Sequence, residues 1–241
     1  MKVLILAGGK GTRFMEESVH MPKPMIRILE KPMMFYIIEH YFKFGFKDFV
    51  ILGGEKVEYI YEYFQKHFET IDSENHIYKV QNKYIVQILY TGKETMTGGR
   101  VKRAIDILNL DNFMLTYGDG FCDVNISELL DFHNKKNTIA TLTGVRPPAR
   151  FGSIEIKNDF IINFGEKAQT KEGWINGGYF VLSSKIYDYI AADDMPLEKE
   201  PLEMLSKIRQ LSVYKHFGYF QPVDTIREKE LVEERLKSYD R

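Results

Sequence analysis

The stretch KVLILAGG, residues 2–9, places a continuous apolar run at the start of the chain and ends it with two glycines. An unbroken apolar run is typical of a strand that is buried on both faces, as in parallel sheets covered by helices. Glycine directly after a strand allows backbone N–H groups to approach a ligand without interference from a Cβ. The stretch therefore predicts a central strand with a ligand-binding turn at its carboxyl end.

Strand-like and helix-like segments then alternate along the chain. The predicted strands are residues 49–52, 85–90, 113–117 and 138–145, and the predicted helices are residues 32–44, 57–68, 99–108 and 126–133. This alternation predicts an α/β fold with a Rossmann-like, three-layer, mostly parallel sheet. In such sheets ligands bind at the carboxyl ends of the strands, where glycines follow Ala7 and Tyr117.

The pattern changes after Pro147-Pro148. Short strands are predicted at residues 153–156, 160–164 and 179–182, the first two forming a hairpin, and helices at residues 201–209 and 227–239. No repeat or linker separates the two parts. We expect a single domain over residues 1–241 with a small β-rich C-terminal portion.

Composition excludes several classes of protein. The chain has 241 residues, 44% of them apolar, and a formal net charge of −1. A near-neutral balance argues against a nucleic-acid binder, and no apolar run approaches the length of a membrane span. The one cysteine, Cys122, allows no disulfide framework, and the six histidines show no spacing typical of zinc sites. We therefore expect a soluble, cytoplasmic protein that binds neither nucleic acid nor membranes.

The turn after the first strand reads Gly8-Gly9-Lys10-Gly11-Thr12-Arg13. Its glycines and its two cations suit a phosphate, which arginine can grip with two parallel hydrogen bonds. It matches neither the P-loop pattern G-x-x-x-x-G-K-[ST] nor the dinucleotide pattern G-x-G-x-x-G. Taken alone, an ordinary strand-to-helix turn is an equally good interpretation.

Three further residues add to this chemistry. Lys23 lies between two prolines in Pro22-Lys23-Pro24-Met25, which holds it on a stiff segment. Asp119 follows a predicted buried strand and suits Mg²⁺, which takes oxygen ligands from one or two carboxylates and from substrate phosphates. Asp224 is the best candidate for a second carboxylate, with a helix N-cap or a turn residue as the alternative interpretation.

In combination these motifs resemble the sugar-phosphate nucleotidyltransferase family, whose signature is a strand followed by G-G-x-G-T-R and then P-K-P-M. Further motifs resemble the glucose-1-phosphate cytidylyltransferases within that family, and they run in order over nearly the whole chain. They are Thr91-Gly92, Met96-Thr97-Gly98-Gly99-Arg100, Tyr117-Gly118-Asp119-Gly120, Pro147-Pro148, Arg150-Phe151-Gly152, Trp174-Ile175-Asn176-Gly177-Gly178, Glu200-Pro201-Leu202 and Gln221-Pro222-Val223-Asp224-Thr225.

The resemblance implies the nucleotide-diphospho-sugar transferase fold, with residues 1–145 binding the nucleotide and residues 146–241 the acceptor. It implies catalytic roles for Arg13, Lys23 and Asp119, and Mg²⁺ binding by Asp119 and Asp224. The implied nucleotide-binding residues are Leu6, Ala7, Gly8, Gly9, Gly11, Thr12, Arg13, Lys23, Thr97, Gly98 and Arg100. The implied acceptor-binding residues are Tyr117, Gly118, Glu166, Lys167, Asn176 and Gly177.

The implied reaction transfers CMP from CTP to a sugar 1-phosphate, with glucose 1-phosphate as the expected acceptor, and yields a CDP-sugar and pyrophosphate. Three alternatives stay open: another phosphorylated acceptor used in capsule or lipopolysaccharide synthesis, another nucleotide (UTP, dTTP or GTP), and a non-catalytic relative. The chain has Ala168 where the family has proline after the acceptor lysine, and its segment 64–85 is shorter than usual. The first difference concerns the acceptor, and the second leaves the formation of a homo-oligomer open.

Overall fold

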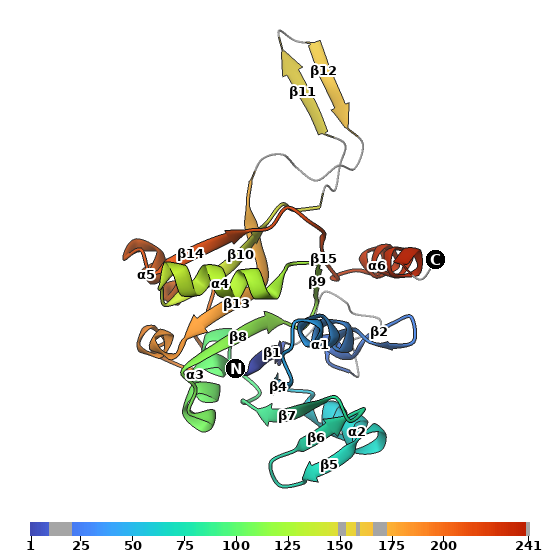
Figure 1. Ribbon diagram of the computed structural model, residues 1–241, viewed down its shortest axis with the longest axis vertical. Coiled ribbons are helices and arrows are strands. Elements are labelled where there is room, and N and C mark those ends of the chain that lie inside the picture. Colours follow the sequence, from blue (N-terminus) through green and yellow to red (C-terminus); the bar gives the residue numbers. More distant parts are fainter. Residues whose placement is uncertain (10–20, 149–152, 158–159, 166–172, 240–241) are drawn as a thin grey trace.

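The computed structural model describes residues 1–9, 21–148, 153–157, 160–165 and 173–239 (Figure 1). Its main feature is a nine-stranded mixed sheet. From one edge to the other the strands are β14 (Leu211–Lys215), β10 (Ala140–Val145), β13 (Ile175–Ser183), β8 (Asn112–Tyr117), β1 (Val3–Ala7), β4 (Asp48–Gly53), β7 (Tyr84–Tyr90), β6 (Ile77–Val80) and β5 (Glu69–Asp72). The four central strands β8, β1, β4 and β7 are parallel. Antiparallel pairs flank them on both sides, and the edge strand β14 pairs parallel with β10.

Six α-helices are present in the described part of the chain. They are α1 (Met33–Lys43), α2 (Val57–His67), α3 (Thr97–Leu108), α4 (Ile126–Lys136), α5 (Glu200–Lys207) and α6 (Ile226–Tyr239). Two 3-10 helices, η1 (Lys23–Met25) and η2 (Ser184–Tyr189), and three small sheets complete the fold. The small sheets pair β2 (Arg27–Ile28) with β3 (Lys31–Pro32), β9 (Gly120–Cys122) with β15 (Phe220–Pro222), and β11 (Ser153–Lys157) with β12 (Phe160–Gly165).

The sheet separates two hydrophobic cores, and β1 contributes to both because successive side chains of a strand point to opposite faces. Val3, Ile5 and Ala7 pack in one core with side chains of α1, α2 and α4. Leu4 and Leu6 pack in the other with side chains of α3, α5 and η2. All five residues of β1 are buried, so the predicted central strand and the three-layer α/β class are confirmed.

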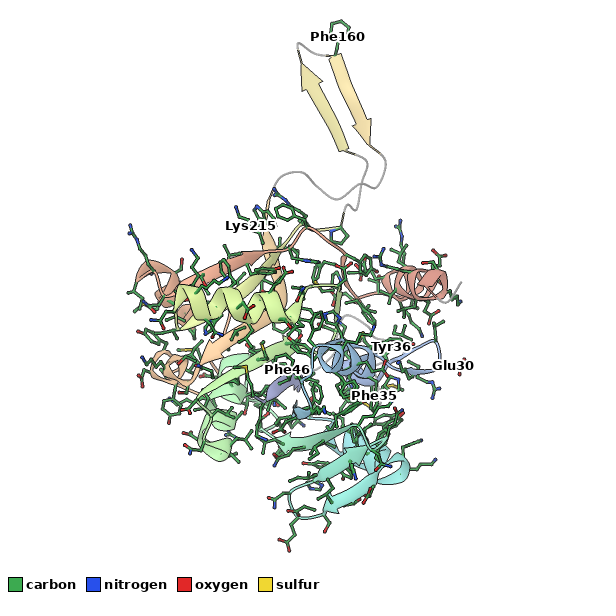
Figure 2. The ribbon with its side chains drawn as sticks, in the orientation of Figure 1. Glu30, Phe35, Tyr36, Phe46, Phe160 and Lys215 are labelled. Carbon is green, nitrogen blue, oxygen red and sulfur yellow. The ribbon has the colours of Figure 1, made fainter. Side chains whose placement is uncertain are left out.

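The sequence pattern did not predict several short strands. β5 and β14 show mostly exposed or half-exposed positions and lack a regular apolar alternation, because they form the two edges of the sheet. The hairpin predicted at residues 153–164 is present as β11 and β12. It projects away from the sheet (Figure 1), with Phe160 at its free end (Figure 2) and 75% exposed.

The parallel register sets the position of the ligand site. Leu6 of β1 pairs with Tyr117 of β8, and Ala7 pairs with Gly53 of β4. The chain segments that follow these strands therefore leave the sheet at one edge, beside each other. Across the described residues, no helix is long and apolar enough to cross a membrane.

Candidate active site

A cavity of about 610 Å³ opens at the carboxyl ends of the central strands. Its lining combines backbone from the first glycine turn with charged side chains from distant segments. The lining residues are Leu6, Ala7, Gly8, Gly9, Lys23, Pro24, Thr97, Arg100, Tyr117, Gly118, Asp119, Glu198 and Asp224. Most of the described residues expected to bind a nucleotide or a metal thus surround one space.

The remaining expected site residues fall into two groups. Gly11, Thr12, Arg13, Glu166 and Lys167 are outside the described residues. Gly98, Asn176 and Gly177 are near the cavity but not part of its lining.

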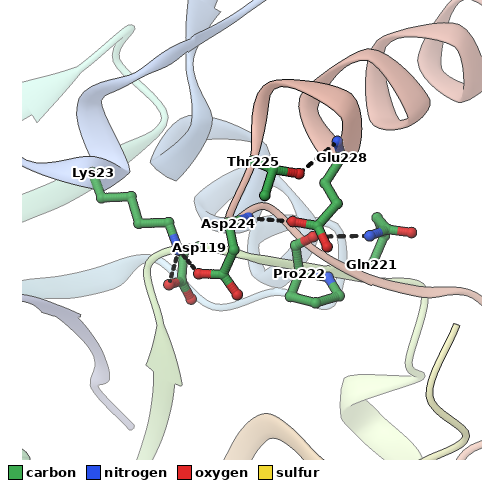
Figure 3. Close-up of polar contacts among 7 residues, drawn as sticks. All are labelled: Lys23, Asp119, Gln221, Pro222, Asp224, Thr225 and Glu228. Carbon is green, nitrogen blue, oxygen red and sulfur yellow. Dashed lines mark hydrogen bonds and ion pairs between the residues drawn. The ribbon is translucent and has the colours of Figure 1, made fainter. Parts of the chain in front are cut away.

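Lys23 forms an ion triad with the two aspartates expected to bind metal (Figure 3). Its Nζ lies 2.7 Å from Oδ2 of Asp119 and 2.6 Å from Oδ1 of Asp224. Burial alone would lower the pKa of Lys23, but the two carboxylates outweigh it, and the pKa is raised. The ammonium is therefore charged and offsets part of the negative charge of the two carboxylates, which come from distant parts of the chain.

The pairing of β9 with β15 brings the two aspartates together. Pro222 lies opposite Gly120, and the Val223 N–H donates to the Asp119 carbonyl at 2.9 Å. The Asp224 N–H donates to Oε2 of Glu228 at 2.8 Å, which ties it to the first turn of α6 (Figure 3). The backbone thus holds both carboxylates on one side of the cavity.

Two prolines and a glycine position Lys23. Pro22 precedes η1 in an extended conformation, and Pro24 lies within it. Pro24 packs so closely on Gly118 that a Cβ there would lie 2.5 Å from the Pro24 Cγ. The P-K-P motif therefore places a stiff lysine against the segment that carries Asp119.

Arg100 lines the cavity and holds the turn after β1 in place. The side chain is 3% exposed, and its guanidinium donates to the carbonyls of Gly8 (3.0 Å), Gly53 (2.9 Å) and Gly92 (2.8 Å) and to the hydroxyl of Thr91 (2.7 Å). A Cβ at Gly8 would lie 2.1 Å from its Cζ, so only glycine fits there. These hydrogen bonds hold the turn after β1 in place, and the nucleotide contact expected of Arg100 stays a prediction.

We expect the Arg100→Lys variant to be less stable by about 2–4 kcal/mol, because lysine cannot span these acceptors and would leave buried carbonyls unpaired. Urea unfolding followed by circular dichroism measures the change. The control is Arg103→Lys on the same helix, where an exposed ion pair with Asp193 should cost less than about 1 kcal/mol. Equal losses in the two variants would contradict the bracing role.

A second polar network in the cavity wall centres on Tyr117. The Tyr117 hydroxyl donates to Oε1 of Glu198 at 2.7 Å and accepts from Nδ2 of Asn176 at 3.0 Å. Burial, with a smaller contribution from Glu198, raises the pKa of Tyr117, so the phenol is neutral and able to donate. Sequence reasoning did not select Glu198, although it stands two residues before the Glu200-Pro201-Leu202 motif.

The donor set suits a divalent cation. Two carboxylate oxygens, one from each aspartate, converge on the Nζ of Lys23. The Lys23 ammonium is thus a cation between the two carboxylates that would hold a metal ion. Mg²⁺ is commonly bound by two carboxylates together with substrate phosphates and water. Among the described residues no group of three or more His, Cys, Asp or Glu side chains could hold a metal ion.

Comparison with known proteins identifies the class. The nucleotidyl transferase family model matches residues 2–223, and the chain belongs to this family of nucleotidyltransferases. The predicted family and enzyme class are thereby confirmed. Use of a divalent metal is general in this family.

Individual relatives narrow the comparison. The chain is 40% identical to glucose-1-phosphate cytidylyltransferase of Salmonella typhimurium, covering 97% of this chain and 95% of the relative. It is 38% identical to a probable glucose-1-phosphate cytidylyltransferase of Bacillus subtilis, covering 93% of this chain and 92% of the relative. Among solved structures, HddC from Yersinia pseudotuberculosis superposes with a TM-score of 0.72 at 26% identity, covering 98% of this chain and 99% of that chain.

Proposed function

We propose that the protein transfers CMP from CTP to glucose 1-phosphate and releases CDP-glucose and pyrophosphate. The proposal of nucleotidyl transfer rests mainly on one observation. Asp119 and Asp224 converge on the Lys23 ammonium beside the glycine turn. The choice of cytidine and glucose rests on the relatives, two of which bear that activity in their names at 40% and 38% identity.

The reaction requires positioning and charge neutralisation rather than a protein nucleophile. A phosphate oxygen of glucose 1-phosphate attacks the α-phosphorus of CTP in line, and the bond to the bridging β-phosphate oxygen breaks. That phosphate is already ionised at neutral pH, so no general base is needed. The cavity accordingly offers a lysine and carboxylates, and no Ser–His or Cys–His pair is among its lining residues.

We assign Mg²⁺ to Asp119 and Asp224, where it would neutralise charge on the triphosphate. Lys23 would then exchange at least one carboxylate for a phosphate oxygen, and Arg13 would grip the same phosphates. Leu6, Ala7, Gly8, Gly9, Gly11, Thr12, Thr97 and Gly98 would surround the nucleotide.

The acceptor would lie against Tyr117 and Gly118. We assign its phosphate to Lys167, and its polar groups to Glu166, Asn176 and Gly177. Hydrogen bonding fixes the Asn176 amide, since its Oδ1 accepts from the Gly178 N–H at 2.9 Å while its Nδ2 donates to Tyr117. A fixed amide is suited to orienting a sugar phosphate.

Pyrophosphate release tests the substrate assignment. With Mg²⁺ present, purified protein should release pyrophosphate with CTP plus glucose 1-phosphate at least about 100-fold faster than with UTP, dTTP or GTP, because a base read by hydrogen bonds is strongly discriminated. A coupled phosphate assay over four nucleotides and a panel of sugar 1-phosphates measures this. Preference for another nucleotide would contradict the cytidine assignment, and CTP turnover only with a different phosphate would replace the acceptor.

A further inference from the structure

Glu198 is a carboxylate in the cavity wall that the ion triad does not use. It follows Leu197, whose side chain is fully buried and whose N–H donates to the Thr97 hydroxyl at 2.8 Å. The segment before α5 is thus anchored to the first turn of α3, and this anchoring sets the position of Glu198.

Two neutral donors hold the Glu198 carboxylate in one orientation. Oε1 accepts from the Tyr117 hydroxyl at 2.7 Å, and Oε2 accepts from the Thr97 hydroxyl at 2.6 Å. A carboxylate has about four acceptor positions, so about two are left for a ligand. Both donors are neutral hydroxyls, so neither contact supplies a positive charge to the carboxylate.

The chemistry of a carboxylate decides which part of a substrate can lie beside Glu198. A carboxylate disfavours phosphate groups beside it, since like charges repel each other. A carboxylate accepts hydrogen bonds only, so its ligand must be a donor such as a sugar hydroxyl. A charge-assisted hydrogen bond to a hydroxyl is about twice as strong as one between neutral groups.

The neighbours of Tyr117 favour the acceptor sugar over the ribose. Tyr117 connects Glu198 to Asn176 of β13, on the side of the cavity assigned to the acceptor. Gly178 lies against the Tyr117 ring, where a Cβ would be 2.5 Å from Cδ2, so the ring packs closely on β13. Asn176, Tyr117 and Glu198 are joined by hydrogen bonds in that order and together form one polar surface.

We propose that Glu198 binds a hydroxyl of the acceptor sugar and makes the enzyme select acceptors that carry it. This inference rests on the proposed function and adds a specificity-determining residue to it. Tyr117 and Thr97 position the carboxylate, and Asn176 orients Tyr117.

Deoxy analogues of the acceptor test the assignment. The rate constant kcat/KM is measured, at saturating CTP, for glucose 1-phosphate and for its 2-, 3-, 4- and 6-deoxy analogues. The wild type should lose about tenfold or more with at least one analogue, because a site that hydrogen-bonds a hydroxyl rejects the compound that lacks it. In Glu198→Gln this discrimination should fall to within about threefold, while the KM for CTP stays within about twofold.

The matched control is Glu203→Gln, the same change at an exposed position of α5 outside the cavity lining, which should keep the wild-type ratios. Thermal unfolding checks that each variant folds. If Glu198→Gln does not fold, the same comparison of deoxy analogues is made with Glu198→Ala. The inference would be wrong, with the proposed function unaffected, in either of two cases. The Glu198 variants would keep the wild-type kcat/KM ratios between glucose 1-phosphate and its deoxy analogues, or they would show a raised KM for CTP with those ratios unchanged. Absence of CMP transfer by the wild type to any sugar phosphate would overturn the proposed function with it.

Discussion

The Asp119→Asn variant is expected to lose about 10³-fold or more in kcat, with its fold intact. The amide removes half of the anionic charge that the two aspartates present, and it leaves a weaker ligand for a divalent cation. Lys23 keeps Asp224 as a partner at 2.6 Å, so no buried charge is left unpaired. Pyrophosphate release at saturating CTP measures the loss, and circular dichroism monitors the fold.

Asp131→Asn provides the control, because Asp131 is an exposed residue of α4 outside the cavity lining. It should keep kcat within about twofold of the wild type, as surface substitutions usually have small effects. If Asp119→Asn retained near-normal turnover, the metal role of Asp119 would be wrong, whatever the identity of the substrates.

Removing the Lys23 ammonium should have opposite effects on turnover and on metal affinity. In Lys23→Met we expect kcat/KM to fall about 10²-fold or more, because a cation that neutralises the phosphates is lost. The protein without nucleotide should nevertheless bind Mn²⁺ about tenfold more tightly. Its two carboxylates then lack the counter-charge that lies 2.6–2.7 Å from them in the wild type.

Electron paramagnetic resonance of free Mn²⁺ during a protein titration gives this affinity directly. Lys66→Met, an exposed lysine of α2, should bind Mn²⁺ as the wild type does. Weaker or unchanged Mn²⁺ binding in Lys23→Met would show that the ammonium does not occupy the cation position between the aspartates.

Local sequence pattern predicted the centre of this fold well and its edges poorly. β1 and its parallel neighbours β4 and β8 consist mostly of consecutive apolar residues that are buried, so the sequence alone indicates that they are buried strands. β9 and β15 have three residues each, and only long-range pairing makes them strands. That pairing is what unites Asp119 with Asp224, and no local pattern contains it.

The site shows the same division. Pro22-Lys23-Pro24 and Asp119 were recognisable as motifs, because a stiff lysine and a carboxylate after a strand have direct chemical meanings. Arg100 stands in a motif, but its hydrogen bonds to three backbone carbonyls depend on how β1 and β4 end beside α3. Glu198 could be assigned only after its contacts with Tyr117 and Thr97 were known, since an isolated glutamate before a helix is ordinary.

The most direct test of CMP transfer follows the α-phosphorus itself. The protein is incubated with Mg²⁺, glucose 1-phosphate and CTP labelled with ³²P at the α-position, and the products are separated by chromatography. The account predicts that the label moves into CDP-glucose, that the pyrophosphate released is unlabelled, and that both products require glucose 1-phosphate. Label that stays in CTP, or that is released as CMP without joining the sugar phosphate, would contradict it.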